Sequence, residues 1–177
     1  MVETGRIKVF KLSFEGKEQI LHIYGPGNMF GEVPAFSGRN FPASSMALEK
    51  TSIIFLPRDK FVDLISAMPG LAMNLLGDLS MRLREFTVQI ENLSLKEVPA
   101  RLAAYILTLS EEHDSTDVVT LPISKVQLAN LIGTTPETVS RVLKKMTAAE
   151  LIEVQTKNIH IDNFDGLVDL AESGTLP

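Results

Sequence analysis

The sequence of 177 residues contains no cysteine. The protein can therefore form no disulfide, no thiolate metal site and no cysteine-ligated iron–sulfur cluster. Its sequence also lacks any apolar run near the roughly 20 residues that a transmembrane helix needs, and any N-terminal apolar stretch of the signal-peptide type. These absences predict a cytoplasmic protein that does not enter a membrane.

Motifs of the common enzyme classes are missing as well. There is no GxSxG, no HExxH and no phosphate-binding loop, and the carboxylates show no pairing that suggests acid–base catalysis. We therefore expect no enzymatic activity. The composition, 45% apolar and 22% charged, is that of an ordinary globular protein whose length allows one sizeable core or two modest ones.

The formal net charge of −5 argues against a uniformly basic protein, but a whole-chain charge can hide a local basic face. Residues 124–157 carry five basic and three acidic side chains, a local balance of +2. The excess of acidic residues therefore lies elsewhere in the chain.

Short alternating segments fill the first third of the sequence. Short runs of alternating apolar and polar residues occur in RIKVFKL, EQILHIY and TSIIFLP. The turn signals EG, GPGN and SGRN separate these segments. The pattern predicts antiparallel strands in a roll or sandwich between Arg6 and about Pro57, and we assign residues 1–69 to a β domain.

The period of the apolar residues changes after this region. The spacing 3-4-3-4-3, which is the a/d seam of a coiled coil, relates Leu76, Leu79, Leu83, Phe86, Ile90 and Leu93. Such a stripe can pack on the β domain of its own chain or on the same helix of a second copy. Because the seam is narrow and strictly spaced, we favour a parallel homodimer. We assign residues 70–97 to this helix and a hinge, which precedes a helix expected over about 98–112.

Two helix starts with a turn between them are visible further on. Ser124 and Gln127 have the spacing of a capping box. In the helix that follows, the residues expected to be buried are Val126, Leu128, Leu131 and Ile132. Gly133 supplies a turn, Thr135 is a natural N-cap and Pro136 stands at the first position of a second helix.

The second helix separates an apolar face from a polar one. The face expected to be buried consists of Val139, Val142, Leu143 and Met146, and the opposite face of Glu137, Ser140, Arg141 and Lys144. A recognition helix carries its base-reading side chains in this way, although an ordinary pair of helices with a solvated face matches the same pattern. The following LIEVQTKNIHID predicts two short strands, a wing beside the helices, so we assign residues 98–177 to a winged helix–turn–helix that binds DNA.

Nearly the whole chain resembles the Crp/Fnr transcription regulators. The resemblance rests on the order of β-roll, long helix, hinge and winged helix, and on the segments GRIKVF, EGKEQILHIYGPGNMFGE, LPRDKF and GTTPETVSRVLKKM. It implies a sequence-specific regulator that binds an inverted repeat in double-stranded DNA as a homodimer and contacts RNA polymerase. The fold implied is α+β, with an antiparallel β-roll like that of cyclic-nucleotide-binding domains, a long dimerisation helix and a C-terminal winged helix–turn–helix.

By this resemblance Arg141 binds a guanine, and Glu137 contacts the bases close to that guanine on the other strand. Pro136 stands where other members carry a side chain able to contact the site. The residues expected at the DNA are Thr135, Pro136, Glu137, Thr138, Ser140, Arg141, Lys144 and Lys145.

The chain departs from the family pattern in its first domain. The family's roll begins with a helix and further strands before the segment equivalent to GRIKVF, so we expect an incomplete roll, with Met1 either an unusual start or a truncation. In members that bind cyclic AMP, an Arg-Ser-Ala element holds the phosphate, because a buried anion needs a guanidinium and donors. This chain has Phe41-Pro42-Ala43 there, and Phe86 where such members place a small hydroxyl residue. We therefore expect the effector not to be a cyclic nucleotide.

What remains at the effector site is an apolar pocket formed by Phe30, Phe36, Phe41, Leu83 and Phe86, suited to haem, another hydrophobic ligand or nothing. The residues expected around an effector are Gly31, Glu32, Phe36, Arg39, Phe41, Leu83, Phe86 and Thr87. His22 and Met29 are candidate haem ligands, although a lone histidine on a strand is more often a surface or hydrogen-bonded residue. The alternatives are thus a haem-based NO or CO sensor, a cyclic-AMP-responsive regulator, or a dimeric module whose winged helix binds a protein.

Overall fold

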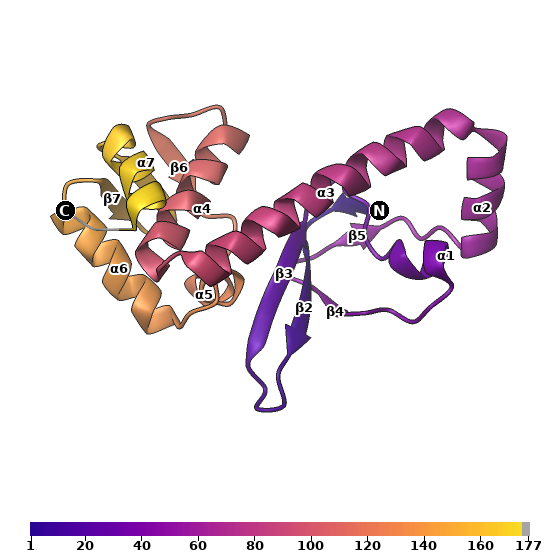
Figure 1. The fold of residues 1–177 in the computed structure, drawn as a ribbon, viewed down its shortest axis with the longest axis horizontal. Coiled ribbons are helices and arrows are strands. Elements are labelled where there is room, and N and C mark those ends of the chain that lie inside the picture. Colours follow the sequence, from indigo (N-terminus) through magenta and orange to yellow (C-terminus); the bar gives the residue numbers. More distant parts are fainter. Residues whose placement is uncertain (175–177) are drawn as a thin grey trace. The chain divides into compact units, whose positions relative to one another are not determined.

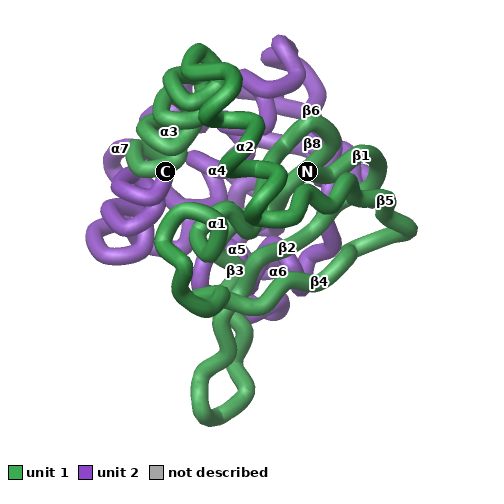
Figure 2. Tube along the Cα trace, turned by 90° about the vertical axis from the view of Figure 1, so that its right-hand side faces the viewer, with its two compact units in different colours: residues 1–85 green, residues 86–177 purple. Residues whose placement is uncertain are grey.

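The computed structural model describes residues 1–174 and divides into two compact units, one comprising residues 1–85 and the other beginning at residue 86 (Figure 2). The division falls inside one long helix, α3 (Pro69–Leu95), which therefore contributes to both units. Each unit has its own strands and its own apolar core.

The strands of the first unit form two antiparallel sheets. One has the strand order β3–β2–β4, and the other pairs β1 with β5. The strands are β1 (Val2–Thr4), β2 (Ile7–Leu12), β3 (Glu18–Tyr24), β4 (Ser44–Ala47) and β5 (Ser52–Ile53). The two strands predicted from the first two alternating segments are confirmed, whereas β1 and β4 were not predicted and the segment TSIIFLP contributes only two residues to a strand.

The hairpin of β2 and β3 is fixed by its loop. The backbone N–H of Ser13 donates to the carbonyl of Lys17 at 2.9 Å, and that of Gly16 donates to the carbonyl of Ser13 at 3.0 Å. Gly16 has φ +78°, a left-handed conformation that glycine adopts without a steric cost. The hairpin carries its loop away from the rest of the first unit (Figure 1).

The first unit also contains two helices that the sequence analysis did not predict: α1 (Val33–Ser37) and α2 (Arg58–Ala67). A core cluster forms where β1, β2 and β3 meet, with Val2, Ile7 and Tyr24 buried and Val9 and Phe30 packed against them. Phe61 of α2 and Leu75 of α3 are also buried, so both helices contribute an apolar side chain to the interior.

One stripe of α3 remains largely exposed. Leu76, Leu83 and Ile90, spaced by heptads, are 56%, 68% and 65% exposed, whereas Leu79 is half-buried. Among residues 1–174 no single helix is long and apolar enough to cross a membrane, and α2 and α3 meet the length and composition of a span only when taken together across a bend of 113°.

The second unit is a winged helix. Its elements after α3 are α4 (Val98–Glu112), β6 (Val118–Thr120), α5 (Lys125–Ile132), α6 (Pro136–Ala148), β7 (Ile152–Gln155), β8 (Asn158–Ile161) and α7 (Phe164–Ser173). The strands form an antiparallel sheet in the order β6–β8–β7. The predicted fold class, the helix over 98–112 and the two wing strands are confirmed, whereas α7 was not predicted.

The core of this unit contains apolar side chains from α4, α5, α6 and α7. Its fully buried large residues are Leu102, Ile106, Leu128, Met146, Leu151, Ile152, Ile159, Leu167, Leu170 and Val119. One prediction for α5 was wrong, because Val126 is 55% exposed while the small Ala129 is fully buried. At 100° per residue Val126 lies about 200° from Leu128, on the other side of the helix.

Candidate nucleic-acid interface

The turn between α5 and α6 is held by local hydrogen bonds. The Oγ of Ser124 accepts from the backbone N–H of Gln127 at 3.2 Å, and the Oε1 of Gln127 accepts from the backbone N–H of Ser124 at 2.8 Å. This is the predicted capping box. At the other end of α5, Gly133 adopts φ +70°, which lets the chain turn directly into the next helix.

Helix α6 starts at the predicted residue and in the predicted phase. Thr135 is the N-cap, with its Oγ1 accepting from the backbone N–H of Thr138 at 3.3 Å, and Pro136 opens the helix. The buried residues of α6 are Val139, Val142, Leu143 and Met146, as predicted. Because these four side chains anchor one side of α6 in the core, its opposite side is held outward.

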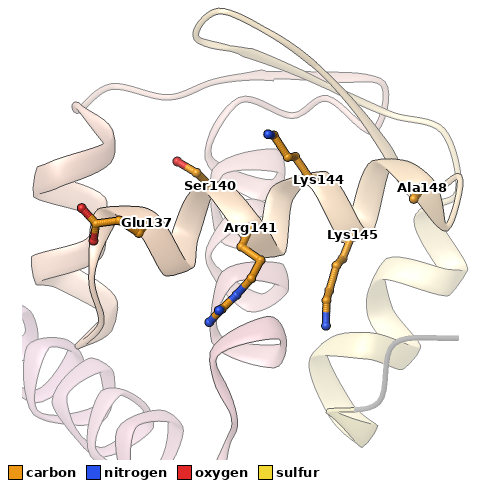
Figure 3. Close-up of a pocket in the computed structure, with 6 residues that line it drawn as sticks. All are labelled: Glu137, Ser140, Arg141, Lys144, Lys145 and Ala148. Atoms are coloured by element: carbon orange, nitrogen blue, oxygen red, sulfur yellow. The ribbon is translucent and has the colours of Figure 1, made fainter.

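The outward side of α6 forms a shallow groove on the surface. Its lining residues are Glu137, Ser140, Arg141, Lys144, Lys145 and Ala148. Figure 3 shows Ser140 and Lys144 leaving one edge of the helix, Arg141 and Lys145 leaving the other, and Glu137 at the N-terminal end. The structure thus brings together five of the eight residues predicted to contact DNA, while Thr135, Pro136 and Thr138 form the start of the same helix.

The carboxylate of Glu137 is held in its ionised form. Its pKa is lowered because the carboxylate accepts hydrogen bonds from its own backbone N–H and from the hydroxyl of Thr135. An ionised carboxylate only accepts hydrogen bonds, so in a groove of duplex DNA its partner is an amino group such as the N4 of cytosine.

The cationic side chains of α6 complement this acceptor. Arg141, Lys144 and Lys145 are all exposed. A guanidinium can donate two hydrogen bonds to the O6 and N7 of guanine, whereas lysine ammonium groups act as point charges that suit phosphates. The arrangement therefore combines groups that can discriminate bases with groups that bind the backbone of any sequence.

The wing follows α6 directly. Strands β7 and β8 are joined by a tight turn at Thr156 and Lys157, where Thr156 has φ +60°. The Oγ1 of Thr120 donates to the Oδ1 of Asn158 at 2.9 Å, which ties β6 to the first residue of β8. Lys157 is exposed at the turn, so the wing presents one more cation.

Comparisons with known proteins agree with this geometry. Residues 100–170 match the Crp-like helix-turn-helix domain, and residues 1–68 match the cyclic nucleotide-binding domain. The cyclic AMP receptor protein of Thermus thermophilus is 31% identical over 171 residues, which cover 97% of this chain and 78% of that protein. The chain belongs to the Crp/Fnr family of DNA-binding transcription regulators.

Solved Crp/Fnr structures have the same fold. FixK2 from Bradyrhizobium japonicum superposes with a TM-score of 0.84 at 24% identity, covering 96% of this chain and 85% of that chain. A Crp/Fnr-family transcriptional regulator of Thermus thermophilus superposes with a TM-score of 0.73 at 26% identity, covering 99% of this chain and 87% of that chain. The architecture of roll, long helix and winged helix is thus shared across the family.

Relatives of the Crp/Fnr family that are named for different functions are equally similar to this chain. An anaerobic regulatory protein of Haemophilus influenzae is 31% identical over 173 residues, covering 96% of this chain and 67% of that protein, and so is as similar as the cyclic AMP receptor protein.

An arginine that the sequence analysis did not single out lies at the predicted effector site. Arg82 of α3 donates from Nη1 to the Oε1 of Glu32 at 2.8 Å, and the side chains of the two residues are only 16% and 10% exposed. Fifty positions separate them in the sequence, and no local motif links a residue of the loop before α1 to one on α3. Of the predicted effector residues, Glu32 is thus already paired within the chain.

The aromatic residues predicted to form an apolar pocket have different surroundings. Phe30 packs into the core cluster with Tyr24, their ring centroids 5.8 Å apart. Phe36 meets Phe61 of α2 edge to face at 5.3 Å, and Phe41 is mostly exposed. Leu83 and Thr87 are exposed on α3. A pocket shared by all of these residues stays a prediction.

His22 is packed against its neighbours on β3. Its ring lies 4.5 Å from that of Tyr24, and burial lowers the pKa of His22 below its ordinary value of 6.5, against the opposing effect of Glu85. The backbone carbonyl of Met29 accepts a hydrogen bond from the Nη2 of Arg82. Coordination of haem by His22 or Met29 stays a prediction.

Proposed function

We propose that this chain acts in the cytoplasm as a homodimer on an inverted-repeat operator, with residues 1–69 as effector domain, 70–97 as dimerisation helix and hinge, and 98–177 as DNA-binding domain. The observation that carries the proposal is the groove on the outward side of α6, which is lined by one acceptor, one hydroxyl and three cations. A two-fold symmetric dimer presents two such helices, so its preferred site has the matching symmetry.

Within each half-site the proposed roles follow from the chemistry of the side chains. Arg141 donates to the O6 and N7 of a guanine, Glu137 accepts from a cytosine amino group, and Ser140 meets a base or phosphate. Lys144, Lys145, Thr135 and Thr138 contact phosphates, and Pro136 contributes shape alone. As a transcription regulator, the bound dimer contacts RNA polymerase.

The dimer is proposed from the exposed stripe of α3. Isolated apolar residues on a protein surface are ordinary, but heptad-spaced leucine and isoleucine side chains that are more than half exposed form a continuous apolar seam. A second copy of the same helix buries this seam, and the half-exposed Phe86 and half-buried Leu79 and Leu93 supply its alternate positions.

Selection of binding sites from random duplex DNA tests this function. The full-length protein is expected to enrich an inverted repeat whose half-sites are one helical turn apart, with an affinity that falls steeply as the salt concentration rises. Enrichment of a single half-site, or binding that does not depend on salt, contradicts a dimer that reads DNA through α6.

We further propose that the effector is not a cyclic nucleotide. Burying a cyclic phosphate without a cation costs several kcal/mol, and at the family's phosphate-binding position Phe41 has no charge while Pro42 has no N–H to donate. Titration calorimetry with cyclic AMP or cyclic GMP should therefore detect no binding tighter than about 1 mM.

Arg39 provides the control for this experiment, because its guanidinium is close in sequence to Phe41. Micromolar binding that is lost in Arg39→Ala would restore a cyclic-nucleotide sensor with a different clamp. Micromolar binding that does not change in Arg39→Ala would assign the phosphate to another cation, such as Arg82 beside Glu32, or would place the ligand elsewhere in the chain. Either result overturns the proposal on the effector and leaves the proposed DNA binding intact.

A further inference from the structure

One charged side chain of α3 is tied to the β-roll at three points. The guanidinium of Arg82 donates to the carboxylate of Glu32 at 2.8 Å and to the backbone carbonyl of Met29. It also lies over the ring of Tyr24, 5.1 Å from the ring centroid, a distance at which a cation is attracted to the aromatic face. We name Arg82 and Glu32, with these contacts, the Arg82–Glu32 clamp.

The clamp differs in kind from the other contacts of α3 in the first unit. Leu75 is buried and Leu79 half-buried, and the burial of apolar area by itself is non-directional. A guanidinium is planar and its donors have a fixed geometry, and removing one partner of a buried ion pair leaves an uncompensated charge. The clamp therefore resists rotation of α3 about its own axis.

Rotation of α3 decides which residues form the apolar seam. Consecutive helical residues are about 100° apart, so the direction of Arg82 sets the direction of Leu83 and, at heptad spacing, of Leu76 and Ile90. With Arg82 turned to the roll, these three residues are more than half exposed, as are Met73 and Met81 elsewhere on α3, and it is the heptad spacing that distinguishes the seam.

We propose that the Arg82–Glu32 clamp sets the rotation of α3 and so presents its seam to a second copy of the chain without a bound effector. The inference rests on the proposed homodimer, and it makes Arg82 and Glu32 positioning residues for operator binding. Because Arg82 of α3 already binds the carboxylate of Glu32, the contact between the roll and the helix forms without a small molecule.

The absence of cysteine from the chain makes a direct test available. A single cysteine introduced by Leu83→Cys in the full-length protein should form a disulfide with its copy, because facing seam positions bring the two Cα atoms within disulfide range. In the same Leu83→Cys protein, the further substitution Arg82→Met should lower the cross-linked fraction at least about threefold. A rotation of the helix by the angle between two consecutive residues, about 100°, moves position 83 out of the seam. Arg84→Met removes an exposed arginine of the same helix and should leave cross-linking unchanged.

Three further variants in the Leu83→Cys protein test the role of Glu32: Glu32→Gln, Glu32→Ala and the double variant Arg82→Met/Glu32→Ala. Glu32→Gln keeps an oxygen acceptor at the same place and should reduce cross-linking less than Arg82→Met. Arg82→Met and Glu32→Ala remove the same interaction. The double variant Arg82→Met/Glu32→Ala should therefore lose no more cross-linking than whichever single variant loses more. Thermal unfolding measured by circular dichroism identifies any variant that has lost its fold.

The outcomes separate the inference from the function on which it rests. If Leu83→Cys alone gives no cross-link, the proposed dimer seam is wrong. If it cross-links equally well with and without Arg82→Met, or if the losses of Arg82→Met and Glu32→Ala add, the dimer stands and the Arg82–Glu32 clamp does not set the rotation of α3.

Discussion

Replacing Leu83 with glutamate is expected to convert the protein to monomers and to weaken operator binding by about 10²–10⁴-fold, because the two half-sites are then bound independently. Leu83 is 68% exposed in the isolated chain, so the substitution does not disturb a core. In the proposed dimer the two new carboxylates face each other near the two-fold axis, where like charges repel and the leucine contacts are lost. Sedimentation velocity and an operator titration on the same sample measure both effects.

Met81→Glu is a matched control for this experiment. Met81 is 66% exposed on α3 and is two residues from Leu83, so that the same helix receives the same charge at nearly the same exposure. Because position 81 lies outside the heptad seam, the dimer and its operator affinity should persist. A protein that stays dimeric with Leu83→Glu would place the subunit interface on another surface.

Truncation of Arg141 is expected to remove sequence discrimination at one base pair of each half-site. Two hydrogen bonds from a guanidinium to guanine are worth about 1–3 kcal/mol, so Arg141→Ala should weaken operator binding by this amount per half-site and make the four base pairs nearly equivalent at that position. The fold should not change, because Arg141 is exposed and the buried side of α6 is intact. Binding measured over a panel of operators with single substitutions resolves the position.

Lys144→Ala separates charge from base reading. The ammonium group of Lys144 lines the same groove one turn further along α6. Its loss should weaken binding to all DNA sequences alike. It should also reduce the salt dependence of the affinity by the amount expected for about one phosphate contact per half-site. Full operator selectivity in Arg141→Ala, or altered selectivity in Lys144→Ala, would reverse the two assignments.

The winged helix was predictable because its signals are local. The start of α5 is marked by the capping pair Ser124 and Gln127, and that of α6 by the N-cap Thr135 followed by Pro136. Each signal acts within one helical turn, so both helix starts can be predicted from the sequence. The outward face of α6 then follows from helical geometry. Val126 shows the limit of this reasoning, since its apolar side chain suggested burial although it lies on the side of α5 away from Leu128.

The first unit was less predictable because long-range contacts define it. Strand β1 exists through its pairing with β5, where Val2 faces Ile53, and neither segment is long enough to have a period of its own. Strand β4 has the sequence SSMA and is exposed throughout, so that no alternation marks it. The contact of Arg82 with Glu32 likewise joins two positions that carry no common motif, and it becomes visible only when α3 is folded against the roll.

If DNA is bound through the groove of α6, as proposed, the charges of this groove also affect the first encounter with DNA. Its three cations lie in a segment with a balance of +2, whereas the chain as a whole carries −5. A polyanion is therefore attracted to one face and repelled by the acidic surfaces elsewhere, so that encounters in the wrong orientation are brief. Weak attraction to random sequence also shortens each non-specific residence, so that little of the protein is retained at the many competing sites of a genome.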